Sequence, residues 1–401
     1  MDTLGIYISV PFCRSKCTYC NFASGVFPAG YHQRYIERIV EDICGVRHRA
    51  RQMGALLPTL VDSVYLGGGT PSILAPELLQ QLFAALRSEF SIAENVEITL
   101  ECAPGHLAED FLVAMVDCGV NRVSFGVQSF IDREAAVTGR LHTRQVALRD
   151  IERVQAVGMR SVNVDLIAGL PRQIASSWRE SVGVLIDSGV EHASIYMLEV
   201  DEDSRLGKEL IDRGGRYHAG TVPSDDQVAD FYLEACATLA RSGLQQYEIS
   251  NFARPGRESL HNKKYWLRQP YIGFGLDAHS MLQGDDGAVR FQMTDDLPSY
   301  LDGAGFADVH RVSREQSLEE AWFLGLRLNE GVSTAELAEE FGESGPRSYQ
   351  PAIGDLTASG LLEMNTGRLR LTAHGRLISN DIFERFLRPP AVEEQALVMV
   401  D

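Results

Sequence analysis

Three cysteines spaced C-x3-C-x2-C, at Cys13, Cys17 and Cys20, directly follow an apolar run from Leu4 to Val10. The spacing places three thiolates on the loop that leaves a predicted first strand. Thiolates are soft ligands that suit iron–sulfur clusters. With no fourth cysteine close by, one iron of a [4Fe–4S] cluster would stay open to a cofactor. Zinc is the alternative, but zinc sites usually take a fourth Cys or His at short spacing, and Asn and Phe follow here.

This loop, preceded by Tyr7, Pro11 and Phe12, resembles that of the radical S-adenosylmethionine (SAM) superfamily. The resemblance implies that the open iron binds the amino and carboxylate groups of SAM, and that reduction releases a 5′-deoxyadenosyl radical. It also implies an electron donor such as flavodoxin or ferredoxin. The chemistry belongs to the cofactor and the protein positions it, so we expect the rest of the chain to form a SAM pocket.

The composition limits the domain organisation, the partners and the location of the protein. At 401 residues, 45% of them apolar, the chain can form one large domain and a smaller one. The formal net charge of −18 argues against nucleic acid as a partner. No run of 18 apolar residues and no signal segment is evident, so any membrane contact would be peripheral. An odd number of cysteines, seven, favours free thiols and a cytoplasmic location.

Apolar β-type runs alternate with helical stretches from Leu4 to about Ala253. The predicted strands are Leu4–Val10, Val61–Leu66, Val96–Leu100, Arg122–Val127, Ser161–Ile167 and His192–Leu198. The predicted helices are roughly Tyr31–Arg51, Pro76–Phe90, Leu107–Cys118, Arg144–Val157, Trp178–Ser188 and Asp225–Ser242. This α/β pattern predicts a parallel sheet covered by helices, either a partial (β/α)6 barrel or a doubly wound sheet. In both, the chemistry belongs at the carboxyl ends of the strands.

Chemistry-bearing residues recur at those ends. Gly67-Gly68-Gly69-Thr70 follows the second strand, and its glycines allow a close approach of backbone to ligand. Glu101 ends the third strand, where it could equally be a surface or capping acid. Each motif alone could be a tight turn or an ordinary polar loop. Because the motifs recur at successive strand ends, one convergent site is favoured.

Together these motifs resemble the branch of the superfamily that contains oxygen-independent coproporphyrinogen III oxidase, an enzyme of porphyrin biosynthesis. By that resemblance Tyr7, Gly68 and Glu101 would contact the cluster-bound SAM. The residues implied around a second SAM, whose presence stays open, are Tyr19, Gly69, Thr70, Gln128, Arg140 and Asp165. An acid and an amide suit ribose hydroxyls, and an arginine suits a carboxylate.

Three later motifs resemble the haem chaperone branch called HemW. They are Tyr247-Glu-Ile-Ser-Asn-Phe-Ala253, His261-Asn-x-x-Tyr265-Trp266, and the Gly-x-Gly run that leads to Ala278-His279-Ser280. The resemblance extends from about Gly5 to the end of the chain. The oxidase pattern has a fourth cysteine two residues after the third, where this chain has Phe22. Phe22 therefore favours the chaperone branch over the decarboxylating oxidase.

His261 or His279 could ligate haem iron, with Tyr265 and Trp266 packed against the macrocycle. A hydrogen-bonded structural histidine is the alternative for each imidazole, and core packing for the two aromatics. Several relatives have a cysteine shortly before the His-Asn pair. Here Glu258-Ser259-Leu260 occupies that stretch, so one thiolate ligand is missing.

The expected domains are a radical SAM core at 1–290, a linker at 291–312, a C-terminal domain at 313–390 and a mobile tail at 391–401. Gly284–Gly287 is predicted to be a turn between two short strands. In the C-terminal domain, helices near Ser317–Leu328, Thr334–Phe341 and Gln350–Ser359 precede a hairpin with strands at Gly360–Glu363 and Arg368–Leu371, and a helix at Gly375–Leu387 follows. This order predicts a winged-helix-like α+β domain. The acidic balance favours a lid or a docking surface over DNA binding.

Two functions are compatible with the sequence. One is a haem chaperone that carries a [4Fe–4S] cluster and SAM and passes haem to client haemoproteins. The other is a radical SAM enzyme, either a coproporphyrinogen III oxidase or a methyltransferase that uses two SAM molecules. Phe22 and the later motifs favour the chaperone, whereas the full set of SAM-pocket motifs favours the enzyme. A third hypothesis, a degenerate structural relative, is disfavoured by the three cysteines.

Overall fold

The computed structural model describes residues 3–285 and 287–387. The chain divides into two compact units, Met1–Ser313 and Arg314–Asp401. The tail expected at 391–401 lies outside the described residues, as does the end of the domain expected at 313–390.

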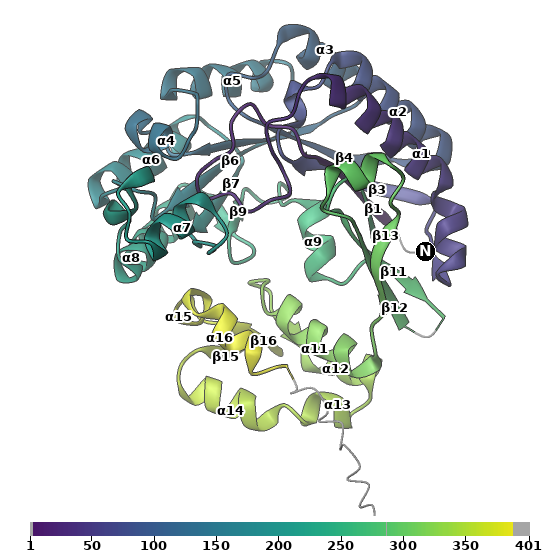
Figure 1. Ribbon diagram of the computed structural model, residues 1–401. Coiled ribbons are helices and arrows are strands. Elements are labelled where there is room, and N and C mark those ends of the chain that lie inside the picture. The colour runs from purple at the N-terminus through teal and green to yellow at the C-terminus, as the bar shows by residue number, and fades with distance from the viewer. Residues whose placement is uncertain (1–2, 286, 388–401) are drawn as a thin grey trace, which may run out of the picture. The chain divides into compact units, whose positions relative to one another are not determined.

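Six parallel strands form the centre of the first unit (Figure 1). They are β1 (Leu4–Val10), β3 (Leu60–Gly68), β4 (Ser91–Cys102), β5 (Arg122–Gln128), β6 (Ser161–Ala168) and β7 (His192–Met197). They pair in this order, which confirms the six predicted strands. Because the order from β1 to β7 follows the chain without a reversal, the sheet winds as a partial barrel and not as a doubly wound sheet.

Helices cover the outer side of the curved sheet (Figure 1). They are α1 (Gly30–Gln52), α2 (Pro76–Glu89), α3 (Glu109–Asp117), α4 (Asp132–Val137), α5 (Arg144–Ala156), α6 (Ala175–Asp187) and α8 (Asp225–Arg241). Helix α1 shows why the helices pack against the sheet, because its apolar residues recur at helical spacing and are buried. These residues are Tyr35, Ile39, Ile43 and Val46. The shorter helices are η1 (Pro71–Ile73), α7 (Arg205–Ile211), η2 (Arg216–Thr221) and α9 (Leu260–Trp266). Of these, α9 lies on the inner side of the sheet (Figure 1).

Further strands extend both sides of the parallel centre. Beyond β1 lie β10 (Tyr271–Phe274), β11 (His279–Gly284), β12 (Gly287–Met293) and β13 (Phe306–Arg311), with β2 (Ala55–Leu56) paired to β11. Beyond β7 lie β9 (Asn251–Ala253) and β8 (Gln245–Gln246). Strand β10 is parallel to β1, whereas β11, β12 and β13 are antiparallel to their neighbours. Gly284 pairs with Gly287, so the predicted turn does join two strands.

The linker expected at 291–312 is wrong. This stretch holds the end of β12, helix α10 (Leu297–Leu301) and β13, all within the first unit. Its apolar side chains are the physical reason, because Phe291, Leu297 and Tyr300 are buried. The Tyr300 hydroxyl also donates a 2.7 Å hydrogen bond to the Asp42 carboxylate on α1.

The second unit is a small winged-helix-like α+β domain. Its helices are α11 (Arg314–Gly325), α12 (Thr334–Phe341), α13 (Ser344–Arg347), α14 (Gln350–Ala358), α15 (Ala373–Leu377) and α16 (Ser379–Glu384). Its sheet has the order β14 (Val332–Ser333), β16 (Arg368–Leu371), β15 (Leu362–Asn365). The single last helix expected at Gly375–Leu387 is wrong, because non-helical backbone angles at Ile378 divide that stretch into α15 and α16. In the described residues of the whole chain, no helix is long and apolar enough to cross a membrane.

Candidate functional site

The three motif cysteines open onto one cavity of about 550 Å³ at the carboxyl ends of the parallel strands, here named the cysteine cavity. The sulfur of Cys13 lies 3.7 Å from the Thr70 hydroxyl, and that of Cys20 lies 3.8 Å from the Ser24 hydroxyl. Burial raises the pKa of the Cys13 thiol. Within residues 3–285 and 287–387, no group of three or more His, Cys, Asp or Glu could hold a metal ion as it stands. The donor set nevertheless fits an iron–sulfur cluster, because three soft thiols share one cavity.

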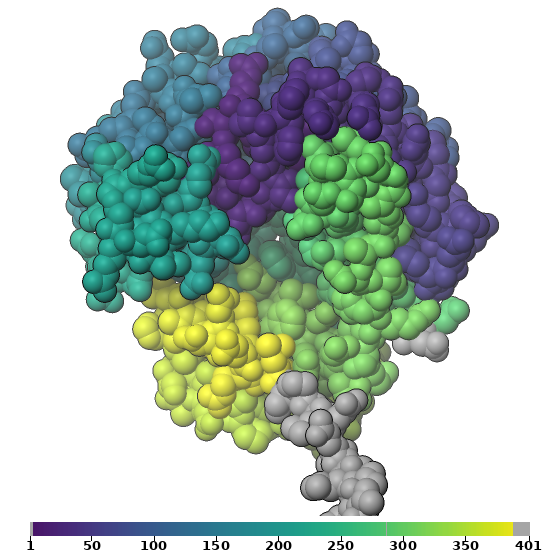
Figure 2. All heavy atoms as spheres, viewed as in Figure 1, coloured from purple at the N-terminus to yellow at the C-terminus, as the bar shows by residue number. Residues whose placement is uncertain are grey.

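The cysteine loop is held by backbone hydrogen bonds from several segments. The Cys13 amide donates to the Gly25 carbonyl at 2.8 Å, and the Thr18 amide donates to the Thr138 carbonyl at 3.0 Å. From α7, the Leu206 amide donates to the Thr18 carbonyl at 2.8 Å. Figure 2 shows this purple N-terminal segment at the surface beside the teal segment that contains α7. The loop is therefore supported on both sides.

The glycine motif is required by close approach of the backbone. A Cβ atom on Gly69 would lie 2.6 Å from the Val10 carbonyl oxygen, and one on Gly67 would lie 2.9 Å from the Glu101 carboxylate. Gly68 has φ of +95°, which side-chain-bearing residues rarely adopt. A larger residue here would displace the cysteine loop or Glu101. Gly68, Gly69 and Glu101 all line the cysteine cavity.

Glu101 forms part of the cavity wall at the end of β4. Its carboxylate accepts a 2.8 Å hydrogen bond from the Tyr65 hydroxyl. Burial raises the pKa of Glu101 to about 7, the charge of Asp165 adds to this, and hydrogen bonds from Tyr65 and the Gly68 amide oppose it. The carboxylate can therefore change its charge near neutral pH when a ligand arrives.

The residues expected around a second SAM also meet in the cysteine cavity. They are Tyr19, Gly69, Thr70, Gln128, Arg140 and Asp165. Arg140 donates a 3.2 Å hydrogen bond to the Tyr19 hydroxyl. Gln128 Oε1 and Arg140 Nε have no hydrogen-bond partner in the described chain, and Gln128 has φ of 69°. Unsatisfied polar atoms and a strained backbone at a cavity wall fit a site for a polar ligand.

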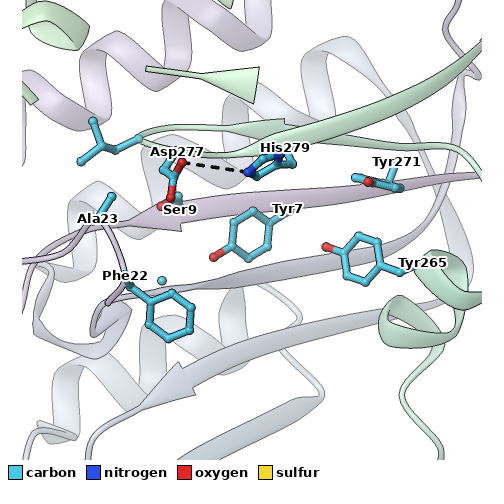
Figure 3. A pocket seen from close by; sticks show the side chains of 10 residues that line it. Tyr7, Ser9, Phe22, Ala23, Tyr265, Tyr271, Asp277 and His279 are labelled. Carbon is cyan, nitrogen blue, oxygen red and sulfur yellow. Dashed lines mark ion pairs between the residues drawn. The ribbon is translucent and has the colours of Figure 1, made fainter. Parts of the chain in front are cut away.

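Tyr7 lines a second cavity of about 350 Å³, here named the aromatic cavity, and is not among the residues of the cysteine cavity. The aromatic cavity is lined by Tyr7, Ser9, Phe22, Ala23, Gly68, Tyr265, Tyr271, Leu276, Asp277 and His279. Figure 3 shows Phe22 and Tyr265 on opposite sides of Tyr7. Gly68 and Phe22 line both cavities, so the two cavities adjoin.

Two of the four haem candidates, Tyr265 and His279, line the aromatic cavity. The His279 side chain is 62% exposed, and its Nε2 atom lies 4.0 Å from an Asp277 carboxylate oxygen (Figure 3). An exposed imidazole at a cavity wall can reach a metal ion bound in that cavity. Trp266 is not among the residues of either cavity and packs edge-on against Tyr265, at a centroid separation of 6.3 Å.

His261 has the contacts of the structural alternative. Its ring is 1% exposed, its Nδ1 lies 3.0 Å from the Ser63 hydroxyl, and its Nε2 lies 2.8 Å from the Tyr265 hydroxyl. Burial and then the charge of Lys264 lower the pKa of His261 to about 3. Both ring nitrogens are occupied, so His261 fixes the wall of the aromatic cavity as the structure stands.

Several lining residues were not singled out from the sequence. Tyr196 of β7 lines the cysteine cavity, and Tyr271 and Asp277 line the aromatic cavity. The Gly-x-Gly run was the available signal for Asp277, because that run places it in a loop before β11, where its φ is 57°. No sequence signal pointed to Tyr271, because strand β10 was not predicted.

Comparison with known proteins agrees with this geometry. The sequence profile of the Radical SAM superfamily matches residues 7–185, and that of the HemN C-terminal domain matches residues 312–378. The chain is 32% identical to "Heme chaperone HemW" of Bacillus subtilis (strain 168), over 95% of this chain and 98% of that protein. It is 30% identical to "Heme chaperone HemW" of Escherichia coli (strain K12), over 96% and 99%.

Among solved structures, coproporphyrinogen III oxidase (HemN) from Escherichia coli superposes with a TM-score of 0.82 at 22% identity, and the match covers 96% of this chain and 90% of that one. This likeness shows the fold. Fold and cysteine loop together define a protein of the radical SAM superfamily. Within it, identity over nearly the full length places the chain in the HemW family.

Proposed function

We propose that this protein is a radical SAM-fold haem chaperone. Cys13, Cys17 and Cys20 hold a [4Fe–4S] cluster in the cysteine cavity, SAM binds beside it, and haem binds in the aromatic cavity before transfer to a client haemoprotein. The observation that carries the proposal is the adjacency of the two cavities, which share Gly68 and Phe22. One presents thiols and polar groups, and the other presents three tyrosines and an accessible imidazole.

The cluster and SAM would supply electron-transfer and radical chemistry when bound. This chain's own residues would hold SAM by the glycine backbone at Gly68 and Gly69 and by Glu101. Gln128 and Arg140 each have a polar atom without a hydrogen-bond partner in the described chain. These atoms support a binding site for a further polar ligand, such as a second SAM. Free cysteines and an oxygen-sensitive cluster support a cytoplasmic location, and a flavodoxin or ferredoxin is the proposed reductant.

We propose His279 as the haem ligand in preference to His261. His279 is exposed in the aromatic cavity, whereas both nitrogens of His261 are hydrogen-bonded. Tyr7 and Tyr265 would pack against the macrocycle. A cavity of about 350 Å³ is small for a ligand site, so the macrocycle would stay partly exposed, which suits a protein that releases haem.

The test is an anaerobic haem titration of the cluster-reconstituted protein, followed at the Soret band. We expect saturable binding with one haem per chain that His279→Ala weakens at least tenfold. His310→Ala is the matched control, because His310 is an exposed histidine on β13 that lines neither cavity. Non-saturable binding, or equal binding by His279→Ala and the wild type, would contradict the proposed site.

A radical SAM enzyme is the second candidate function. The unsatisfied atoms of Gln128 and Arg140 favour it, because they indicate a cavity built for a bound polar substrate or cofactor. Coproporphyrinogen III decarboxylation and SAM-derived methyl transfer are the two reactions to assay, with and without a reductant. Phe22 at the junction of the cavities argues against the decarboxylation, because the oxidase pattern has a cysteine there.

A further inference from the structure

The inner faces of the parallel strands carry polar side chains. Alternate residues of a strand share one face, so Arg122, Ser124, Gly126 and Gln128 follow one another along the inner face of β5. Gly126 and Gln128 line the cysteine cavity. One step deeper, the Ser124 hydroxyl donates to an Asp165 carboxylate oxygen at 3.4 Å. Arg122 is therefore the next side chain beneath the floor of the cysteine cavity.

Arg122 is a buried cation without a bonded partner. It is 3% exposed, and its Nε has no hydrogen-bond partner. No hydrogen bond or ion pair joins its guanidinium to any other residue among 3–285 and 287–387. Besides burial, its charge acts on the pKa of five groups from five segments: Tyr65, Asp165, His192, Tyr247 and His261. These segments surround the interior of the barrel, which places the guanidinium among them.

Several carboxylate, amide and imidazole groups nearby are bonded to one another or to backbone amides. Asn163 donates to Asp165 at 2.7 Å, and the His192 ring lies 2.6 Å from the Asn163 oxygen. The Glu97 carboxylate accepts the backbone amides of Leu260 and His261, both at 3.0 Å.

These carboxylate, amide and imidazole groups are thus engaged with one another or with backbone amides, and none of them bonds the guanidinium. The Thr99 and Ser161 hydroxyls, which lie opposite Arg122 on the two neighbouring strands, also lack hydrogen-bond partners in the part of the chain that the structure describes. A buried charge is costly unless it is paired and hydrogen-bonded, so this position calls for an anion.

We propose that Arg122 binds a carboxylate group inside the barrel, beneath the cysteine cavity. The planar guanidinium matches a carboxylate with two parallel hydrogen bonds. Three carboxyl groups already lie in this interior, Glu97, Glu101 and Asp165, so their repulsion favours a monovalent carboxylate over a multiply charged phosphate. The carboxylate can be a free small acid or an acid arm of a tetrapyrrole, and only the second source rests on the proposed function.

The first arm of the test uses formate and needs no haem. Thermal unfolding is measured while formate replaces chloride at constant ionic strength. We expect a saturable rise in melting temperature for the wild type, as for any ligand that binds only the folded state, and none for Arg122→Gln. The matched control is Arg153→Gln, because Arg153 lies on α5 and is bonded to Glu109 and Asp150 outside the barrel. It should keep the wild-type response.

The second arm compares haem with its dimethyl ester, which lacks the free acid groups. If the source is a tetrapyrrole arm, the wild type binds haem at least tenfold more tightly than the ester, and Arg122→Gln removes the difference. If Arg122→Gln does not fold, Arg122→Lys retains the charge without the planar donor pair, and its carboxylate response should be weaker than that of the wild type. An Arg122-dependent response to formate supports the site, and an Arg122-dependent preference for haem over its ester identifies a tetrapyrrole acid arm as the source. No such response in either arm overturns it and leaves Arg122 as a counter-charge for the interior acids.

Discussion

The Tyr265 hydroxyl lies 2.8 Å from Nε2 of His261, and the same Tyr265 side chain lines the aromatic cavity. His261 therefore acts on the cavity through Tyr265 and not by direct contact. The Ser63 hydroxyl, 3.0 Å from Nδ1, fixes the ring from the other side. This arrangement links a buried strand residue of β3 to a cavity wall on α9.

Acid should destabilise the protein through His261. Burial, with the charge of Lys264, lowers the pKa of His261 to about 3 in the folded state, while the unfolded imidazole has an ordinary value near 6.5. The unfolded state then binds more protons below pH 6.5, so stability falls as the pH falls from 6.5 towards 3, by at most about 1.4 kcal/mol per pH unit from this group. Urea unfolding between pH 7 and 5 should show a smaller acid loss for His261→Gln. An equal loss in both proteins would contradict the burial of a neutral ring.

SAM binding should strengthen with pH through Glu101. Burial raises the pKa of Glu101 to about 7, so the carboxyl is largely neutral at pH 5.5 and becomes charged above 7. Because SAM is cationic, we expect its dissociation constant to fall by up to about tenfold per pH unit between pH 5.5 and 7. In the ligand-free protein the sign is opposite, and stability should fall as the pH rises from about 4.5 to 7.

Isothermal titration of the cluster-loaded protein checks the Glu101 prediction. Glu101→Gln should show a flat profile over this range, while Glu109→Gln, an exposed acid on α3, should keep the wild-type slope. A Glu101→Gln profile as steep as that of the wild type would remove Glu101 from the SAM site.

Gly69→Ala should damage the cysteine loop. The new Cβ would lie 2.6 Å from the Val10 carbonyl oxygen and 2.9 Å from that of Phe12, so the backbone must shift. We expect a loss of about 1–3 kcal/mol of unfolding free energy, typical of overpacking, together with a lower iron content. Gly183→Ala on α6 is the control, because nothing lies within 4 Å of its added Cβ. Equal unfolding free energies for Gly69→Ala and Gly183→Ala would show that the backbone tolerates an added Cβ atom at position 69.

Cys17→Ser should abolish cluster loading. A hydroxyl is a poor substitute for a soft thiolate ligand of iron, so iron and sulfide per chain should fall to the background of the assay after anaerobic reconstitution. Cys44→Ser is the matched control, since Cys44 is an exposed free thiol on α1. Wild-type iron content in Cys17→Ser would mean that the cluster is held elsewhere.

Most of the fold could be predicted from the sequence, because buried parallel strands are nearly continuous apolar runs. Val61–Leu66 and Ser161–Ile167 were of this kind, and both lie within observed strands. Strand β13 could not be found this way. Phe306–Arg311 is half exposed, and the strand pairs with β12, which itself lies outside the six central strands.

The cysteine cavity was more predictable than the aromatic one. Residues such as Glu101 and Asp165 end successive parallel strands, and parallel topology brings such ends together. The role of His261 could not be read from its motif, because burial and the contact with Ser63, 198 residues away in sequence, arise only from tertiary packing. Arg122 gave no signal for the same reason, since its lack of a partner depends on how its neighbours pair.

The most direct test of the central claim is haem transfer from the loaded protein to a b-type apoprotein, followed by absorbance under anaerobic conditions. A chaperone should deliver haem at a rate that rises with the concentration of the acceptor. His279→Ala should deliver less, because it loads less haem. A rate independent of acceptor concentration and equal to passive haem loss, together with coproporphyrinogen decarboxylation by the same preparation, would contradict the account and establish the enzyme instead.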